Sequence, residues 1–473
     1  MKKFQFGFLA AALLLGLSLS SCKKDIGQIS FPETMTDSYE IAAGQKLDIN
    51  FSVENLQDGE LSVSIETDNT DFDLTVPQIE GNTVSFTITA PDFIKEETKV
   101  DYLVEVTDSM HEERETISRT ISVTAKPEAN LFRTAQKANC IISEAGKIVC
   151  FKAFKGNSGD IVNFDTAKLI WQDMQGLVSK IIRSDDEIAV WLTEGTCGNA
   201  LIGAYYDDVL VWTYHLWVIN SDPAAALYEY TNADGVKFSF IDRNLGATDA
   251  SSAGASSSLY YYWGNMHPYA GGQTAVYDIE NNALEYTTEE TATICSENSL
   301  DDIYEYAFTR PMTFFASNTN RTGNYEWLFV HKDAAKWEEK ADLWGGVSGK
   351  KSVYDPCPEG YKVPQYAAMD AFKAANTTQE KQYNGEVANK NFIGWTFTNE
   401  SGTTFFPAAG DYNNSVKFEA FYNGENTFPT AYLWAADMQV ENWRATAFKG
   451  TPSSAAPLGQ AMGYALNIRC VKE

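Results

Sequence analysis

Apolar and polar residues alternate along residues 28–126 in the manner of β-strands. Turn residues such as Ala43-Gly44 and Glu80-Gly81 separate the alternating runs, of which the clearest are 47–53, 61–65, 84–88 and 117–123. A period of two turns one face of each strand toward a core and the other toward water. About seven short strands in about a hundred residues are typical of an immunoglobulin-like β-sandwich. We therefore predict such a sandwich for residues 28–126, although not of the antibody type, because the segment lacks tryptophan and cysteine.

The pattern changes after Lys126-Pro127, which we interpret as a domain boundary. Residues 130–220 contain longer and more continuous apolar runs, at 169–171, 188–191 and 209–218. Such runs indicate a second strand-rich unit. We predict a second, β-sandwich-like domain here. All eleven tryptophans of the chain lie at or after Trp171, so the aromatic residues are concentrated beyond the first domain.

Residues 221–473 are rich in aromatic residues, glycine and asparagine, and they show few helical patterns. One helix is expected at 366–375, directly after Pro364, and a shorter one near 333–340. The Ser- and Ala-rich stretch 249–258 is typical of a flexible loop. Strands and loops fill the remainder, and we predict an α+β domain.

The N-terminus carries a strong targeting signal. Residues 1–21 combine a basic start, a short apolar run and small residues, as a secretory signal peptide does. Leu19-Ser20-Ser21-Cys22 resembles the bacterial lipobox, in which the cysteine is acylated and becomes the first residue of the mature protein. The following tether, 22–27, resembles the charged export signals of outward-facing Bacteroidota lipoproteins. We expect a lipid anchor at Cys22 on the outer membrane; the alternative is an ordinary signal peptide beside an incidental cysteine.

Composition narrows the range of partners. The chain has 36 Lys and Arg against 64 Asp and Glu, a net charge of −28. Nucleic acid is an unlikely partner on this ground, since phosphate binding needs clustered positive charge. The acidic residues indicate a solvated surface; calcium binding is the alternative, but the sequence has no Asp-x-Asp-x-Asp-Gly loop. We expect no cofactor.

Six cysteines remain besides Cys22, and none of them forms a C-x-x-C pair. The four histidines are scattered as well, so we expect no metal site. Cys140 and Cys150 flank Glu144-Ala145-Gly146-Lys147, which is typical of a hairpin turn. A disulfide between these two cysteines is therefore plausible in an exported protein.

A series of short phrases resembles the Fibrobacter succinogenes major paralogous domain family. The phrases occur in order over roughly 135–473: ANCII at 138–142, KGN at 155–157, GNA at 198–200, WTYHLW at 212–217, DRNLGA at 242–247, YYWG at 261–264, YDPCPEGYKVP at 354–364, FPAAG at 406–410 and IRCVK at 468–472. The resemblance implies a C-type-lectin-like architecture for residues 221–473. Because a terminal strand ties the chain ends in such folds, it also implies a disulfide between Cys357 and Cys470.

Candidate ligand residues lie within and beside these phrases. Tyr261, Tyr262, Trp263 and His267 follow the expected flexible loop, where aromatic faces could stack on sugar rings. Packing in the core is the alternative for these aromatic residues. Arg243 has two interpretations, a structural partner of Asp242 and buried carbonyls or a ligand contact.

These features predict a surface adhesin that binds a glycan or a host or bacterial surface protein, with the first sandwich as a spacer. The alternative is a tip or accessory subunit of a fimbria, in which edge strands would pair with other pilus subunits. We do not expect an enzyme. Formylglycine-generating enzymes share the related fold, but their chemistry needs paired active-site cysteines, and the sequence offers no comparable pair and no nucleophile–base set.

Overall fold

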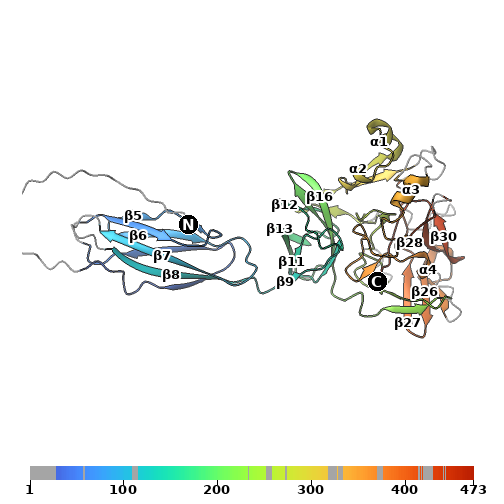
Figure 1. The fold of residues 1–473 in the computed structure, drawn as a ribbon. Helices are drawn as coiled ribbons and strands as arrows, with labels where there is room; N and C mark the ends of the chain where they lie inside the picture. Colours follow the sequence, from blue (N-terminus) through green and yellow to red (C-terminus); the bar gives the residue numbers. More distant parts are fainter. Residues whose placement is uncertain are drawn as a thin grey trace, which may run out of the picture. The chain divides into compact units, whose positions relative to one another are not determined.

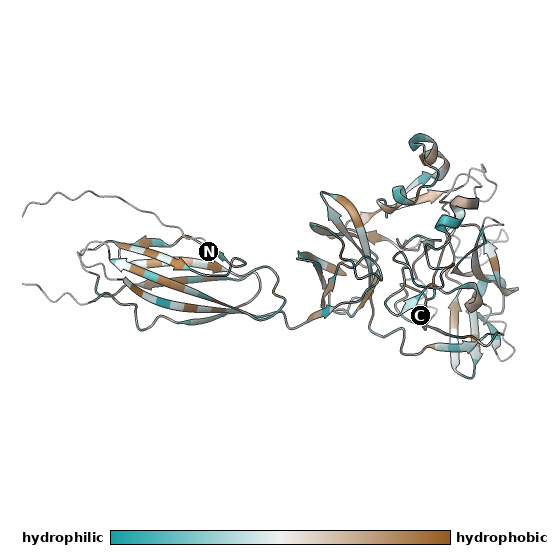
Figure 2. Cartoon of the chain, in the orientation of Figure 1, coloured by the Kyte–Doolittle hydropathy of each residue, from teal (hydrophilic) through white to brown (hydrophobic). Residues whose placement is uncertain are grey.

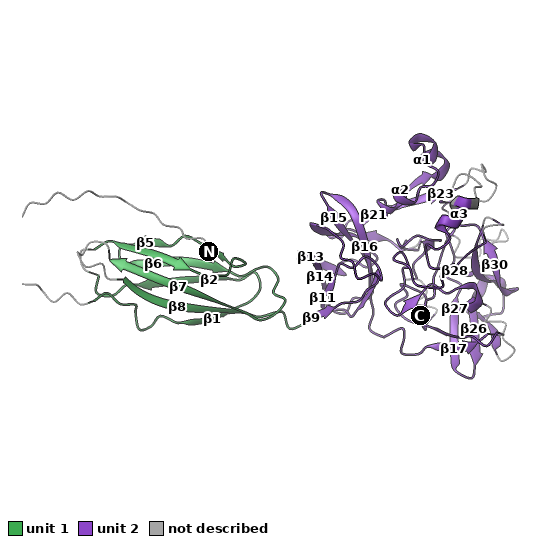
Figure 3. Cartoon of the chain, viewed as in Figure 1, with its two compact units in different colours: residues 1–131 green, residues 132–473 purple. Residues whose placement is uncertain are grey.

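The computed structural model describes residues 28–473 except 57–58, 109–115, 233, 252–257, 272–273, 318–326, 329–333, 370–376, 414–415, 417, 419–429, 440–441 and 443. The predicted signal peptide 1–21, the tether 22–27 and Cys22 lie outside the described residues, as does most of the loop 249–258. Within the described part, no helix is long and apolar enough to cross a membrane. The chain is mostly β-sheet and divides into two compact units, residues 1–131 and residues 132–473 (Figures 1 and 3).

The first unit consists of two sheets that share one core. One sheet has the order β1-β8-β7-β3 and the other the order β2-β6-β4, with β5 also paired to β6. The bounds are β1 Ser38–Ile41, β2 Lys46–Ser52, β3 Leu61–Glu66, β4 Asp73–Leu74, β5 Gln78–Glu80, β6 Thr83–Thr89, β7 Thr98–Asp108 and β8 Thr116–Ala125. The four predicted strands coincide with β2, β3, β6 and β8 and are confirmed.

Burial in this unit follows the alternation of the sequence. In β6, Val84, Phe86 and Ile88 are buried and the residues between them are not. The same two-residue period runs through β7, and it is visible as alternating colours along the strands (Figure 2). The core is therefore the set of inward faces of the two sheets, which makes this unit a β-sandwich.

The second unit begins with two further sheets. A six-stranded sheet has the order β10-β16-β15-β12-β20-β21, and a four-stranded sheet has the order β13-β14-β11-β9. The bounds are β9 Leu131–Thr134, β10 Cys140–Ser143, β11 Ile148–Lys152, β12 Thr166–Gln172, β13 Val178–Ser184, β14 Glu187–Leu192, β15 Gly198–Tyr206, β16 Val209–Val218, β20 Val276–Tyr277 and β21 Ala283–Leu284. β15 and β16 are buried along most of their length.

The rest of the second unit is built from small sheets and short helices. The strands are β17 Tyr228–Thr231, β18 Lys237–Phe240, β19 Tyr261–Tyr262, β22 Thr287–Glu290, β23 Thr313–Ala316, β24 Tyr361–Lys362, β25 Thr378–Tyr383, β26 Phe392–Asn399, β27 Gly402–Pro407, β28 Ala431–Gln439, β29 Arg444–Gly450, β30 Ala455–Gln460, β31 Ala465–Leu466 and β32 Val471–Lys472. The helices are α1 Thr291–Asn298, α2 Tyr304–Phe308, α3 Ala334–Lys340, α4 Tyr366–Met369 and the 3-10 turn η3 Asn389–Asn391.

The predicted helices are present in part. α3 lies within the expected 333–340, and α4 begins the expected 366–375, whose remainder from residue 370 lies outside the described residues. α1 and α2 were not predicted, because neither segment shows a clear apolar face in the sequence.

Residues 130–220 and 221–473, predicted as two domains, belong to one unit. β20 extends the six-stranded sheet through a pairing of Gln172 with Tyr277. Trp217, at the end of the first segment, is fully buried and donates its indole N–H to the carbonyl of Ala247, 3.1 Å away. The predicted boundary at residue 220 is wrong as a structural division, because the sheet of the first segment is completed and covered by the second.

Candidate functional site

The predicted sugar-stacking residues Tyr261, Tyr262 and Trp263 are all fully buried. The indole N–H of Trp263 donates to the carbonyl of Ala435, 3.0 Å away, and the carbonyl of Tyr261 accepts from the indole N–H of Trp434 at 2.7 Å. The prediction that these three side chains form a ligand surface is wrong. They pack in the main core of the second unit, which was the alternative interpretation.

His267 is also fully buried, and its two ring nitrogens have partners within the chain. Nε2 donates to the carbonyl of Phe308 at 2.9 Å, which leaves Nδ1 to accept from the hydroxyl of Thr213 at 3.0 Å. Burial lowers the pKa of His267 to about 4, although the bond to Phe308 acts in the opposite direction. His267 is therefore a neutral anchor for the end of α2, and the prediction of a ligand contact is wrong.

Arg243 has a structural role, which was the first of its two interpretations. It is 3% exposed, and its guanidinium donates to both carboxylate oxygens of Asp242, at 2.6 and 2.8 Å. It also donates to the carbonyl of Thr248 at 2.9 Å. These bonds use its donors inside the fold, so Arg243 is not available to a ligand at the surface.

The cysteines divide into one disulfide and several thiols. Cys357 and Cys470 are joined, which is the pairing that the family resemblance implied. Cys140 and Cys150 both keep their thiols, so the predicted bridge across the turn is wrong. The reason is topological: the strands on either side of this turn do not pair, since β10 pairs with β16 and β11 pairs with β14 in another sheet.

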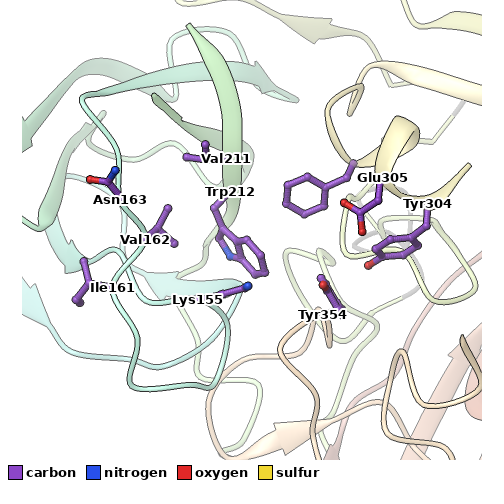
Figure 4. Close-up of a pocket in the computed structure, with 10 residues that line it drawn as sticks. Lys155, Ile161, Val162, Asn163, Val211, Trp212, Tyr304, Glu305 and Tyr354 are labelled. Atoms are coloured by element: carbon purple, nitrogen blue, oxygen red, sulfur yellow. The ribbon is translucent and has the colours of Figure 1, made fainter. Parts of the chain in front are cut away.

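A pocket of about 320 Å³ lies elsewhere in the second unit (Figure 4). Its walls come from the loop after β11, from β16, from α2 and from the segment before the disulfide. Ten residues line it: Lys155, Ile161, Val162, Asn163, Val211, Trp212, Tyr304, Glu305, Phe308 and Tyr354. Among the described residues, no group of three or more His, Cys, Asp or Glu side chains could hold a metal ion, and this pocket contains a single carboxylate.

Four aromatic rings form a continuous wall of the pocket. The ring of Trp212 lies 5.5 Å from that of Phe308 and 6.0 Å from that of Tyr354, with which it is nearly parallel. Tyr304 meets Tyr354 edge to face at 5.3 Å. Such contacts hold the rings rigidly. Trp212 and Tyr304 are buried, at 3% and 4% exposure, so the partly buried rings of Phe308 and Tyr354 supply the aromatic surface that a ligand could reach.

Trp212 is fixed from behind by Asn139. The indole N–H donates to the side-chain oxygen of Asn139 at 2.9 Å. The amide nitrogen of Asn139 in turn donates to the carbonyls of Val353 and Asp355, at 2.7 and 3.0 Å. One buried asparagine thus sets the position of Trp212 relative to the chain on either side of Tyr354.

The loop that carries Lys155 is held against the same segment. Asn157 donates its side-chain amide to the carbonyl of Lys351 at 2.8 Å. Gly156 has a φ of +55°, and a β-carbon there would overlap the carbonyl of Val353. Glycine is therefore required both for this backbone conformation and for the close approach of the two segments.

The polar groups of the pocket lie on opposite walls. Lys155 extends from one wall, with its ammonium 5.6 Å from the centre of the Trp212 ring. Glu305 and the hydroxyl of Tyr304 lie on the other (Figure 4). Tyr304 is 4% exposed, and its hydroxyl has no hydrogen-bond partner within the described part of the chain. Burial raises the pKa of Tyr304 well above its usual value, so the hydroxyl is a neutral donor.

Sequence reasoning missed this pocket, although part of the signal was present. Asn139, Gly156, Trp212 and Tyr354 lie in four of the phrases that carry the family resemblance, and the structure brings these phrases together. A search for phrases that converge in space would have found this side of the pocket. Tyr304, Glu305 and Phe308 lie outside every phrase, and nothing in the sequence marks them.

Comparisons with known proteins add little. No protein-family model matches the sequence, and no curated protein matches it. A Bacteroides ovatus GH5 xyloglucanase in complex with a heptasaccharide is similar over 25% of this chain at 13% identity, with a TM-score of 0.16. This chain spans 22% of that enzyme's length.

Two other solved structures are similar over about two fifths of the chain. A chimeric titin Z1Z2 matches 41% of this chain and 97% of its own at 14% identity, with a TM-score of 0.16. An endo-fucoidan hydrolase of glycoside hydrolase family 107 matches 41% of this chain and 29% of its own at 11% identity, with a TM-score of 0.21. Scores this low do not assign a function.

Proposed function

We propose that this protein is a non-catalytic surface lipoprotein that binds a carbohydrate in the aromatic pocket. The observation that carries the proposal is the pair of partly buried rings of Phe308 and Tyr354 in the pocket, together with the buried, unpartnered hydroxyl of Tyr304. Sugar rings present apolar C–H faces and a rim of hydroxyls. They fit a pocket in which rings supply the contact area and a few polar groups fix the orientation.

The absence of a second carboxylate among the ten lining residues supports binding without catalysis. Glycoside hydrolysis uses two carboxyl groups that flank the scissile bond. The pocket offers Glu305 alone. A sugar held there would meet one possible acid or base and no partner for it.

For the architecture, we propose an immunoglobulin-like spacer at residues 28–126 and a C-type-lectin-like fold of the Fibrobacter succinogenes major paralogous type within residues 132–473. The first assignment is supported by two sheets around one core. The second is supported by the disulfide Cys357–Cys470, which ties the chain close to its end. In this arrangement the spacer separates the binding unit from the membrane.

A glycan array probed with the full chain tests the binding function. We expect retention on a defined set of glycans and a loss of about tenfold in affinity for Phe308→Ala, since one stacking face is removed. Phe238→Ala is the matched control, because Phe238 is also a partly buried phenylalanine of the second unit but lies in β18, outside the pocket. No retained glycan, or equal losses for both variants, would contradict the proposal.

The anchor is tested separately. Cys22→Ala should release the protein from the membrane fraction, because no acyl chain is then attached. The tryptophan fluorescence of the second unit should stay unchanged. Protease treatment of intact cells reports the orientation, and we expect cleavage of the wild-type protein at the cell surface. A Cys22→Ala variant that stays in the membrane fraction would show that the lipobox interpretation is wrong.

A further inference from the structure

Lys155 is the one basic side chain among the ten residues that line the pocket. Its ammonium lies over the ring of Trp212, and no carboxylate within the described residues pairs with it. Lys137, whose ammonium lies 5.5 Å from the centre of the Phe154 ring, likewise has no carboxylate partner in the described part of the chain. Acidic residues outnumber basic ones by 64 to 36, so an unpaired ammonium in the pocket wall is unusual for this chain.

The opposite wall of the pocket carries a negative charge and a hydroxyl donor. Glu305 is exposed and makes no ion pair or hydrogen bond within the described residues, Lys155 included. Its charge helps to raise the pKa of both Tyr304 and Tyr354, for which burial is the larger cause. This wall of the pocket therefore combines one acceptor, Glu305, with the unpartnered hydroxyl of Tyr304.

From this arrangement we infer that the ligand is an acidic sugar, a uronic acid residue, whose carboxylate pairs with Lys155 while its hydroxyls bond to Glu305 and Tyr304. The inference rests on the proposed carbohydrate binding and adds the class of sugar. A sugar ring between the two walls presents its own carboxylate to the ammonium of Lys155. Its hydroxyl groups donate to the carboxylate of Glu305. The hydroxyl oxygens also accept from Tyr304, whose buried donor then gains a partner.

Other ligand classes leave part of the pocket unused. A neutral sugar would satisfy Glu305 and Tyr304 but would leave Lys155 without an anion. A cation would pair with Glu305, but it would leave the Lys155 ammonium, which already lies over Trp212, without an anion. The volume of about 320 Å³ lies at the lower end of the roughly 300–1,000 Å³ typical of small-molecule pockets, so the site holds the end of a chain rather than a long segment.

The test compares trigalacturonate with its trimethyl ester, in which a methyl group removes the charge of each carboxylate. We expect the full chain to bind the acid about tenfold more tightly than the ester at low salt, because a charge-assisted contact is present only with the acid. Raising the salt concentration should reduce this ratio, since Lys155 is exposed to solvent. Isothermal titration calorimetry measures both affinities.

A matched pair of lysine variants locates the effect. Lys155→Gln should bring the acid and the ester to equal affinity. Lys180→Gln should leave the ratio unchanged, because the Lys180 ammonium also lies over a tryptophan ring, 5.0 Å from the centre of Trp191, but outside the pocket.

The outcomes separate this inference from the proposal on which it rests. Equal binding of acid and ester by the wild type, or retention of only neutral glycans on the array, would overturn the acidic-sugar inference and leave carbohydrate binding intact. Loss of the ratio in Lys180→Gln as well would also overturn it. The absence of any retained glycan would remove the proposed function itself.

Discussion

The two units of this chain differ in what their cores are made of. The core of the first unit consists of inward-facing residues at every second strand position, most of them aliphatic. The core of the second contains buried charged and polar groups, among them Lys351, Asp355 and Arg469. Arg469 donates to the side-chain oxygen of Asn244, 225 positions away in the sequence, at 3.0 Å. A local pattern is enough to specify the first unit, whereas the second depends on specific contacts between distant segments.

The largest expected difference between the units concerns the disulfide. Cys357 and Cys470 are 113 residues apart, and a bridge closing a loop of about 100 residues contributes about 4.7 kcal/mol in the chain-entropy model. The double variant Cys357→Ser with Cys470→Ser should lower the free energy of unfolding of the second unit by about 4–5 kcal/mol and leave the first unit unchanged.

Urea titration of the full chain measures this effect. Tryptophan fluorescence reports on the second unit alone, since all eleven tryptophans lie at or after Trp171. Hydrogen exchange of peptides from β6 and β7 reports on the first unit. An equal loss of protection in both units would show that they do not unfold independently, and the comparison would then fail.

The next largest expected difference is in how the stability of each unit changes at acid pH. Burial lowers the pKa of His267 to about 4 and that of His215 to about 3, so both are neutral in the folded state. Between pH 6.5 and 4 the unfolded chain binds a proton at His267 that the folded chain does not. Its contribution to stability is therefore fully present above pH 6.5 and is lost as the pH falls, by about 3 kcal/mol. The first unit has no histidine among its described residues.

His267→Gln isolates this contribution. The variant should show a flatter dependence of second-unit stability on pH between 6.5 and 4, measured by urea titration at several pH values. Asp173 acts in the opposite direction in both proteins, because burial raises its pKa to about 6 and the folded state gains a proton there on acidification. Identical slopes for wild type and variant would show that His267 is not buried as a neutral ring.

The sequence predicted the structure of the first unit better than that of the second. The alternation in residues 28–126 was sufficient to place four strands, because side-chain direction in a strand depends only on position parity. The family phrases marked the disulfide and one side of the pocket. They could not show that Trp263 and His267 are buried, since burial depends on the segments 308–315 and 434–435, which fold over them. Nor could they mark α2, whose role depends on its position rather than on its composition.

One glycine in each unit tests how closely its backbone packs against a neighbouring segment. Gly81 and Gly156 both have positive φ, +64° and +55°, but a β-carbon at Gly81 would meet no atom within 4 Å. Gly81→Ala should therefore cost the first unit only the left-handed backbone strain, about 1–2 kcal/mol. Gly156→Ala adds overlap with the Val353 carbonyl, and its loss should be larger by about 2 kcal/mol. Urea titration of each unit measures both, and equal losses would contradict the close approach beside the pocket.

The smallest expected effect concerns two buried tyrosines, one in each unit. Removing the hydroxyl group should change the stability of the two units in opposite directions. The hydroxyl of Tyr102, in β7 of the first unit, has no hydrogen-bond partner in the described part of the chain, and burial raises its pKa to about 12. Tyr102→Phe removes an unsatisfied polar atom and should stabilise the first unit by about 1 kcal/mol. In the second unit the hydroxyl of Tyr260 donates to the carbonyl of Ala409 at 2.6 Å, so Tyr260→Phe should destabilise by about 1 kcal/mol. Hydrogen exchange measures the first effect and tryptophan fluorescence the second. Two losses of equal size would mean that Tyr102 also has a polar partner, and the contrast between these two hydroxyls would no longer hold.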